Sequence, residues 1–468
     1  MKKVSVSLLA VVVYMALILQ LSSCANIIPP GGGLRDSLPP RLVMAQPKDS
    51  AVNVTSKNIT LTFDEYITLQ SPQQSLIISP NPSSQGTPLI DYKLRNVTIK
   101  LKDSLEPNTT YSFNFGDAIR DVNENNIAQN FTYVFSTGKS IDYNSYSGKV
   151  LLAEKGKVDS TLIVLLHRNL NDTAVLKERP RYYTRLNGKG EFTFRNLPQG
   201  QFAVYVLPGA DISRKYDDST KMFAFRNGPV TISADTPRDT LYAFEEAKRT
   251  EFSTGATAKV AAAARDDKRL KYAHDLENGL QDLLRNFTLS FNRKLTGFDS
   301  TKFILADTSY QKIDGASFTL DSTGTKVILS YPWKEAKPFR LLIAKNAVTD
   351  SAGTELSKAD TIRFITKRES DYGSIRIRFT NLDLSKKPVL QFVQGEKLVE
   401  TVPLTQNDFQ RKRYAPGTYE MRILYDTNQN GKWDTGNYKT KRQPETVYLI
   451  PRQLAIRANW DNEVTIAL

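Results

Sequence analysis

The stretch NITLTFDEYI, residues 58–67, alternates apolar and polar side chains and decides the fold. Ile59, Leu61 and Phe63 occupy every second position, and the residues between them are threonines. Successive side chains of a β-strand point to opposite faces, so a period of two predicts a strand with one buried face.

The same pattern recurs in the segments that follow. Turn-forming residues such as DVNENN (residues 121–126) separate the alternating runs about every ten residues, which is typical of an antiparallel β-sandwich. The further strands of this first segment are expected in NVTIKL (96–101), NTTYSFNF (108–115) and FTYVFSTGK (131–139).

Three motifs give this segment a recognisable character. They are PPRLVMAQPKDSAVNV (39–54), LEPNTTYSFNF (105–115) and FSTG (135–138). Together they resemble the bacterial immunoglobulin-like domain named after the S-layer protein SbsA. The resemblance implies an Ig-like sandwich over residues 41–139.

A second β-rich segment follows, over residues 140–244. Its strands are expected in SGKVLL (147–152), TLIVLLHR (161–168) and GEFTFRNLPQGQFAVYVL (190–207). The last of these resembles the prealbumin-like modules of surface adhesins and carboxypeptidase regulatory domains. That resemblance implies that residues 198–200 form the turn between two core strands.

Residues 245–275 interrupt the strand pattern. The run AKVAAAARDDKRL (258–270) is rich in alanine and charge and has no apolar stripe. It predicts a helical or disordered connector rather than a helix that packs on a partner.

After the connector the sequence repeats itself. NFTLSFNRKL (286–295) aligns with the opening stretch without gaps, at an offset of 286 − 58 = 228. DSAGTELSKADTIRFIT (350–366) aligns with DVNENNIAQNFTYVFST (121–137) at 350 − 121 = 229. Two matches at nearly one offset indicate an internal duplication. We therefore expect a second Ig-like sandwich over residues 276–368.

The last hundred residues continue the duplication. PGTYEMRILYDTNQNGKWD (416–434) aligns with QGQFAVYVLPGADISRKYD (199–217), which predicts a second prealbumin-like module over residues 369–468. The predicted fold class is all-β, a duplicated tandem array of antiparallel β-sandwich modules that follows a lipoprotein signal peptide.

The N-terminus, MKKVSVSLLAVVVYMALILQLSSC (1–24), has two lysines followed by an apolar run too short for a preferred bilayer span. Its end resembles the lipobox of bacterial lipoproteins, which implies that residues 1–23 are removed and that Cys24 carries diacylglycerol. Cys24 is the only cysteine, so the chain has no internal disulfide. Residues 24–40, rich in proline and glycine, are expected to form a tether.

The residues after the lipobox indicate to which membrane the lipoprotein is sorted. Ala25 follows the cysteine, which in lipoprotein sorting resembles a signal for release to the outer membrane. No acidic run follows, whereas the surface-export signals of Bacteroidota lipoproteins resemble such a run. We expect a lipid anchor in the outer membrane with the chain facing the periplasm. The whole tandem resembles exported lipoproteins of the Bacteroidota.

The net charge and the absence of known catalytic motifs limit the classes of function that fit this sequence. The net charge is +14, or +12 without Lys2 and Lys3. For an exported protein this favours anionic polysaccharide over nucleic acid as a partner, or a positive charge that is merely dispersed for solubility. The sequence has no phosphate-binding or dinucleotide motif and no G-x-S-x-G or H-E-x-x-H motif.

The sequence therefore favours a non-enzymatic scaffold, spacer or protein-binding component of the envelope. A polysaccharide-binding lipoprotein is the alternative, and Trp333, Trp433 and Trp460 are the candidate sugar contacts, although aromatic residues of sandwiches more often belong to the core. The only two histidines, His167 and His274, fall in different segments and are expected at strand ends or on the surface.

The loop YDTNQNGKWDTG (425–436) resembles the start of a calcium-binding loop. Its candidate ligands are Asp426, Asn428, Asn430, the carbonyl of Lys432, and Asp434. The twelfth position lacks the bidentate glutamate, so any affinity would be weak, and no other cofactor is expected. The alternative is a structural turn whose Asx side chains bond their own backbone, with Trp433 packed beneath.

Overall fold

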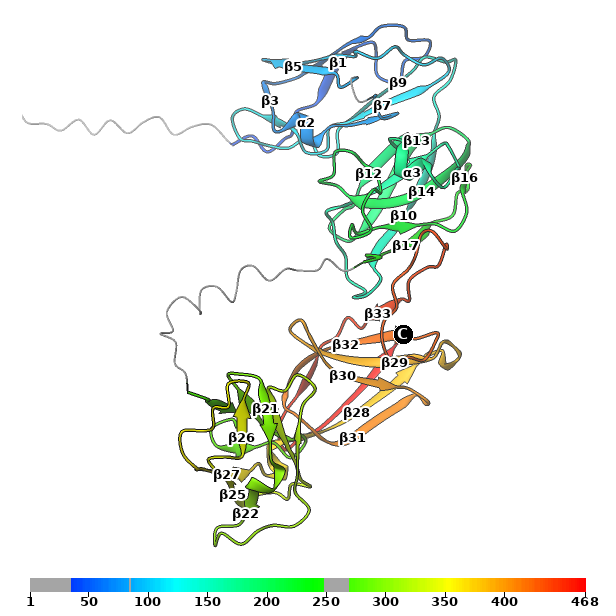
Figure 1. The fold of residues 1–468 in the computed structure, drawn as a ribbon. Helices are drawn as coiled ribbons and strands as arrows, with labels where there is room; N and C mark the ends of the chain where they lie inside the picture. The colour runs from blue at the N-terminus through cyan, green and yellow to red at the C-terminus, as the bar shows by residue number, and fades with distance from the viewer. Residues whose placement is uncertain (1–34, 84–85, 248–268) are drawn as a thin grey trace, which may run out of the picture. The chain divides into compact units, whose positions relative to one another are not determined.

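The computed structural model describes residues 35–83, 86–247 and 269–468, and these are almost entirely β-structure (Figure 1). The predicted all-β fold class is confirmed. No helix in these ranges is long and apolar enough to cross a bilayer. The signal peptide, Cys24 and most of the tether lie outside the described residues. The short helical turns of the described ranges are α2 (Pro72–Ser75), α3 (Ala174–Lys177), η1 (Ser300–Lys302), η2 (Glu369–Asp371) and η3 (Leu384–Lys386).

The sheets of the described residues fall into four groups along the chain. We call these groups the first module (35–143), the second module (144–247), the third module (269–372) and the fourth module (373–468). By compactness, the first module forms one unit together with residues 196–199. The remaining three modules together form another unit.

The first module has the strand order β1-β2-β6-β5 in its largest sheet, with β4-β7-β9 and the pair β3-β8 beside it. In β2 the side chains of Ile59, Leu61 and Phe63 are at most 1% exposed, so the period of two marks the core face as predicted. The strands are β1 (Leu42–Gln46), β2 (Asn58–Phe63), β3 (Ile67–Leu69), β4 (Ile77–Ser79), β5 (Leu89–Lys93), β6 (Asn96–Lys100), β7 (Thr110–Asn114), β8 (Ile119–Asp121) and β9 (Thr132–Ser136).

The third module repeats this topology and adds one short strand, β19, beside β27. Its sheets have the orders β18-β20-β24-β23 and β19-β27-β25-β22, with the pair β21-β26. Phe287 and Leu289 of β20 are buried where the alignment places Ile59 and Leu61. The strands are β18 (Tyr272–His274), β19 (Leu280–Gln281), β20 (Phe287–Phe291), β21 (Leu295–Phe298), β22 (Phe303–Ala306), β23 (Ser317–Leu320), β24 (Lys326–Ser330), β25 (Pro338–Ile343), β26 (Val348–Asp350) and β27 (Asp360–Thr366).

One boundary differs from the prediction. The connector was expected to extend to residue 275, but Tyr272–His274 forms β18 and pairs with β20. Tyr272 explains the difference, because its ring packs against Phe291 and so joins the third-module core. Residues 248–268 of the connector lie outside the described residues.

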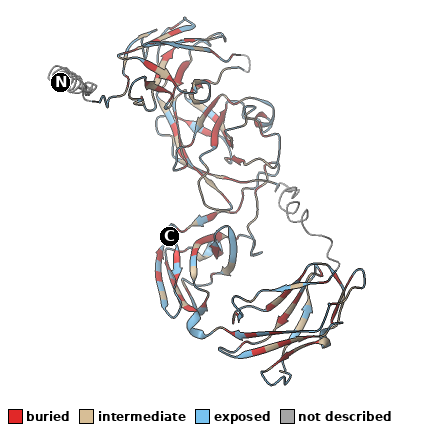
Figure 2. Ribbon diagram, turned by 90° about the vertical axis from the view of Figure 1, so that its left-hand side faces the viewer, coloured by how far each residue is buried: buried red, intermediate tan, exposed pale blue. Residues whose placement is uncertain are grey.

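The second module pairs the sheet β13-β10-β17 with the sheet β12-β11-β14-β15, in which β16 also joins β14. Its strands are β10 (Asn144–Leu152), β11 (Leu162–His167), β12 (Tyr182–Arg185), β13 (Glu191–Leu197), β14 (Gly200–Pro208), β15 (Ala224–Phe225), β16 (Val230–Ile232) and β17 (Asp239–Ala243). Figure 2 shows buried residues alternating with more exposed ones along many strands.

The fourth module has the same arrangement, with the sheets β31-β28-β35 and β30-β29-β32-β33, in which β34 also joins β32. Its strands are β28 (Gly373–Thr380), β29 (Pro388–Gln394), β30 (Lys397–Pro403), β31 (Asp408–Tyr414), β32 (Gly417–Tyr425), β33 (Val447–Leu449), β34 (Leu454–Ile456) and β35 (Asp461–Ala467). The matched sheet orders of both pairs of modules support the internal duplication.

The sequence predicts antiparallel sandwiches, and most strand pairs of the described residues are antiparallel, but some are parallel. In the third module β19 lies parallel to β27. In the second and fourth modules the last strand lies parallel to the first, as β17 beside β10 and β35 beside β28. The chain crosses through the other sheet before it returns, and a return of that length can bring a strand back in the parallel direction.

Candidate functional site

The loop that follows β32 is held together by its own side chains. The carboxylate of Asp426 is 1% exposed and accepts hydrogen bonds from the backbone N–H groups of Asn430 (3.2 Å) and Gly431 (2.7 Å). Asn428 accepts the N–H of Asn430 (3.1 Å), and Asn430 accepts that of Lys432 (2.7 Å). The bonds of Asn428 and Asn430 are Asx turns, and the longer bonds of Asp426 close the loop around them; the structural interpretation predicts such side-chain bonds to the loop's own backbone.

The far side of the loop is fastened by Glu445, which is buried. Its carboxylate accepts the backbone N–H groups of Thr427 (2.8 Å) and Asp434 (3.1 Å). Its backbone carbonyl accepts the indole N–H of Trp433 (2.7 Å), and that indole packs on the apolar cluster formed by Val389, Leu424 and Val447.

The candidate calcium ligands also lie close together. The side-chain amides of Asn428 and Asn430 both reach the same carboxylate oxygen of Asp434. Oxygens of carboxylates and amides suit Ca²⁺, so the residue set fits that ion. No group of three or more His, Cys, Asp or Glu side chains in the described residues, this loop included, is arranged for a metal. The Asx turns account for the observed contacts without an ion, and the calcium site stays a prediction.

The two copies of this loop differ in length, and strand pairing locates the difference. In the second module Val206 pairs with Ala224. In the fourth module Ile423 pairs with Tyr448. Because 423 − 206 = 217 whereas 448 − 224 = 224, the fourth-module loop is seven residues longer. The alignment keeps the offset of 217 through the Asx turns, so the extra residues fall in what we call the docking loop (residues 435–445).

Tyr438 anchors the docking loop on the second module. Its ring packs edge-on against Phe223 and Phe225, with 5.2 Å between ring centroids in each case, and it is 7% exposed. Its hydroxyl donates to the backbone carbonyl of Asp172 (2.8 Å) and lies 3.0 Å from the hydroxyl of Tyr205. A buried tyrosine that is both packed and hydrogen-bonded makes a strong, specific contact.

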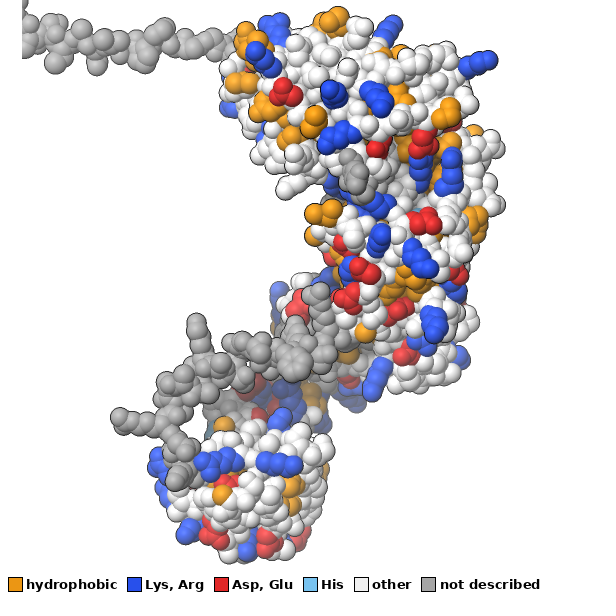
Figure 3. All heavy atoms as spheres, turned by 45° about the horizontal axis from the view of Figure 1, so that its top comes forward, with side chains coloured by type: hydrophobic (Ala, Val, Ile, Leu, Met, Phe, Trp, Pro, Cys, Tyr) orange, Lys and Arg blue, Asp and Glu red, His pale blue; other side chains and the backbone are white. Residues whose placement is uncertain are grey.

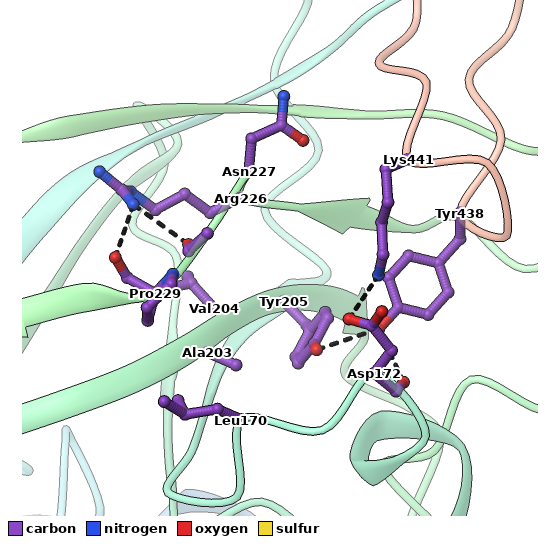
Figure 4. A pocket seen from close by; sticks show the side chains of 11 residues that line it. Leu170, Asp172, Ala203, Val204, Tyr205, Arg226, Asn227, Pro229, Tyr438 and Lys441 are labelled. Atoms are coloured by element: carbon purple, nitrogen blue, oxygen red, sulfur yellow. Dashed lines mark hydrogen bonds and ion pairs between the residues drawn. The ribbon is translucent and has the colours of Figure 1, made fainter.

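Polar side chains surround this anchor. The ammonium of Lys441 lies 3.6 Å from the ring centroid of Tyr438 and 2.7 Å from the carboxylate of Asp172. Figure 4 shows these three side chains together at the edge of a cavity of about 380 Å³. The side-chain amide of Gln443 donates to Asn227 (3.0 Å) and to a carbonyl of β15 (2.9 Å).

The second module also reaches back to the fourth. The backbone N–H of Val447 donates to the carbonyl of Ala153 (3.1 Å), which ties a turn of the second module to β33. Gly156 in that turn has φ +64°, and a Cβ there would lie 2.6 Å from the carbonyl oxygen of Val447, so a side chain does not fit. Lys157 forms a 2.9 Å ion pair with Glu420. Burial alone would raise the pKa of Glu420, but the hydrogen bond from Lys157 helps to hold it below its ordinary value.

The two histidines lie in different modules, His167 in the second and His274 in the third. His274 is exposed at the end of β18, as expected. His167 ends β11 but is only 1% exposed, so the expectation of a strand end is confirmed and that of a surface residue is wrong. It is buried because the second-module sheet is covered on both faces, and its ring stands edge-on to Tyr205 at 5.6 Å. Burial lowers the pKa of His167 to about 4.

The tryptophans also lie in separate places. Trp333 is 8% exposed and donates to the carbonyl of Arg285 (3.0 Å), which makes it a core residue. Trp460 is 60% exposed and lies in a turn before β35. Trp433 lines two neighbouring cavities.

The sequence did not single out Tyr438 or Lys441. Both lie in a polar loop without a motif, and the surface that they contact is more than two hundred residues away in the chain. The available signal was the difference in loop length between the two copies.

A comparison with protein families supports the Ig-like assignment of the first module. A family model described as a bacterial Ig-like domain matches residues 36–137, which confirms the Ig-like character of that segment. No curated protein matches the chain.

Solved structures resemble the chain only distantly. A native alpha-2-macroglobulin from Escherichia coli shares 14% identity over 39% of this chain and 72% of its own, with a TM-score of 0.20. The TIE protein of Bacillus anthracis shares 9% identity over 94% and 75%, with a TM-score of 0.18. The major pilin subunit BcpA of Bacillus cereus shares 11% over 69% and 99%, with a TM-score of 0.16. At such scores these similarities carry no functional argument.

Proposed function

We propose that this chain is a non-enzymatic scaffold or spacer of a bacterial envelope, in which the docking loop fixes the fourth module to the second. The seven-residue insertion that lies across this joint carries the proposal. Successive domains of one chain move relative to each other unless a sizeable apolar interface holds them. Tyr438 supplies apolar and hydrogen-bonded contacts of this kind between the two modules, and these contacts would restrict their relative motion.

The proposal includes attachment to the outer membrane through lipid on Cys24, with the modules facing the periplasm. Its support is the N-terminal sequence, in which a short apolar run ends in a lipobox. One acyl chain binds a membrane only marginally, so the diacylglycerol of a lipoprotein gives the firmer anchor that a scaffold needs. The assignments to Bacteroidota lipoproteins and to the SbsA type of Ig-like domain belong to the same proposal.

Surface charge favours envelope proteins as partners. On the face drawn in Figure 3, Lys and Arg side chains are mixed with Asp and Glu side chains over the described surface. The positive charge of the sequence is therefore spread out on that face, and a dispersed charge provides little attraction for an extended polyanion.

The joint can be tested with Tyr438→Ala in the mature chain. The substitution removes the packed ring and both hydroxyl contacts, and truncation of a buried aromatic costs about 3–5 kcal/mol. We expect scanning calorimetry to show the second and fourth modules unfolding together in the natural protein and separately in the variant. Small-angle scattering should show a larger radius of gyration for the variant.

The matched control is Tyr448→Ala, which removes a tyrosine from β33 of the same module that is 40% exposed. This control should leave both the transition and the radius of gyration unchanged. A Tyr438→Ala chain with the calorimetric profile and the radius of the natural protein would refute the proposed joint.

A further inference from the structure

A polar cavity lies at the joint, on the outer face of β29 and β32. Its volume is about 510 Å³, within the roughly 300–1,000 Å³ typical of small-molecule pockets. Gln391 and Arg422, which pair across the two strands, form its floor. Glu154 and Glu245 of the second module and Trp433 of the fourth module contribute to its walls.

Gln391 is the feature that points to a ligand. Its neighbours Leu390 and Phe392 are fully buried in the fourth-module core, so the alternation of the strand turns Gln391 to the opposite face, toward the cavity. Gln391 is 6% exposed, and its side-chain amide has no hydrogen-bond partner among the described residues. The amide is not among the fully enclosed atoms that lack a partner, so it opens on the cavity and can pair with a molecule bound there.

The other copy shows that the fold does not need polar residues here. Leu165 and Tyr205 pair at the corresponding positions of the second module. Both side chains are buried, and the ring of Tyr205 packs against Tyr438 of the docking loop. In the fourth module Gln391 and Arg422 replace them, so the same sheet face presents hydrogen-bonding groups to a cavity.

The charges around the cavity indicate the class of ligand. The guanidinium of Arg422 is held by Glu420, with 2.7 Å between Nε and the carboxylate, and its charge is thereby compensated. Five acidic and three basic side chains line the cavity, which disfavours an anion: Glu154, Glu245, Glu246, Glu396 and Asp434 against Lys155, Arg422 and Lys432. Trp433 adds a flat apolar surface beside these hydrogen-bonding groups.

We propose that this cavity binds a unit of a neutral saccharide. Its hydroxyl groups would pair with Gln391 and the carboxylates, while the C–H face of the ring would pack on Trp433, since a sugar ring has both kinds of surface. The site rests on the docked arrangement of the second and fourth modules proposed above, and it adds a ligand to what is otherwise a structural joint.

Calorimetric titration of the full mature chain tests this site. The probes are the neutral oligosaccharides cellohexaose, maltohexaose and chitohexaose at millimolar concentration. We expect saturable heat from at least one of them. Gln391→Leu should weaken that binding at least tenfold, because the variant leaves the sugar hydroxyls without their partner.

Gln394→Leu is the matched control, because Gln394 is exposed near the end of the same strand. It should bind as the natural protein does. The absence of heat from all three probes, or equal affinity in Gln391→Leu, would overturn the saccharide site. Scanning calorimetry of each variant separates the two proposals: joined unfolding without saccharide heat refutes only the site, whereas separate unfolding of the natural protein refutes the joint.

Discussion

Acid should destabilise the second module through one buried side chain, His167. It ends β11, is 1% exposed, and its Nε2 atom has no hydrogen-bond partner among the described residues. Burial lowers its pKa from 6.5 to about 4, although the nearby charge of Glu178 acts in the opposite direction. The folded state therefore holds this imidazole neutral at pH values where the unfolded chain would protonate it.

The sign and size of the effect follow from this difference. Between pH 6.5 and pH 4 the unfolded chain binds more protons than the folded chain, so the free energy of unfolding falls as the pH falls. Each pH unit in that window corresponds to about 1.4 kcal/mol, so the contribution at pH 4 is about 3 kcal/mol. That is a large part of the stability of an ordinary domain.

The assay compares denaturant unfolding at pH 7 and pH 4 for the natural chain, His167→Leu and His274→Leu. His167→Leu should lose about 3 kcal/mol less than the natural chain between the two pH values, because nothing remains to protonate at that position. His274→Leu is the control, since His274 is exposed, and it should behave as the natural chain does. An equal loss in the natural chain and in His167→Leu would refute the argument.

Four further predictions follow from the loop, the joint and the N-terminus. Asp426→Ala should lower the free energy of unfolding in urea by roughly 1–3 kcal/mol, because two backbone N–H groups lose their acceptor. If millimolar calcium raises the Tm of the natural chain but not that of this variant, the loop binds the ion. If calcium does not raise the Tm of the natural chain, the metal interpretation is eliminated. Lys157→Ala should destabilise the chain at pH 7 but not in strong acid. The pKa of Glu420 is lowered in the folded chain, so its ion pair contributes stability at pH values above 4.5, and this contribution is lost as the pH falls through the folded pKa. A destabilisation that is the same at every pH in melting curves would contradict this. Cys24→Ser should abolish incorporation of labelled fatty acid, and label on the variant would refute lipidation at that position. Protease added to intact cells should leave the chain uncut, whereas ready digestion would refute the periplasmic orientation.

The strands could be predicted from the sequence because the alternation of apolar and polar residues that identifies a strand lies within a few consecutive residues. Alternation in NITLTFDEYI identifies a strand and its buried face without reference to the rest of the chain, and Ile59 and Leu61 are buried as that pattern requires. The Asx loop could also be anticipated, since Asp426 bonds backbone groups only four and five residues away. The duplication was visible because both copies keep the same core positions.

The joint could not be predicted in the same way. Tyr438 lies among polar residues and has no periodic apolar neighbours, so nothing local marks it as buried. Its partners Tyr205 and Phe223 lie more than two hundred residues away in the chain, so no local pattern connects them with it. The burial of His167 was missed for a related reason, because a strand covered on both faces loses the alternation that distinguishes inside from outside.

The insertion in only one of the two copies also bears on self-association. The fourth module contributes Tyr438, which we call the plug, and the second module contributes the aromatic residues around it, which we call the socket: Tyr205, Phe223 and Phe225. At the position of the socket residue Tyr205, the fourth module carries Arg422, so a plug from another molecule finds no second aromatic socket at the corresponding place. Head-to-tail contacts that do not close produce filaments. Because Tyr438 and its aromatic partners belong to one chain, they meet at high effective concentration, and the contact that would otherwise link molecules into filaments is made within each molecule.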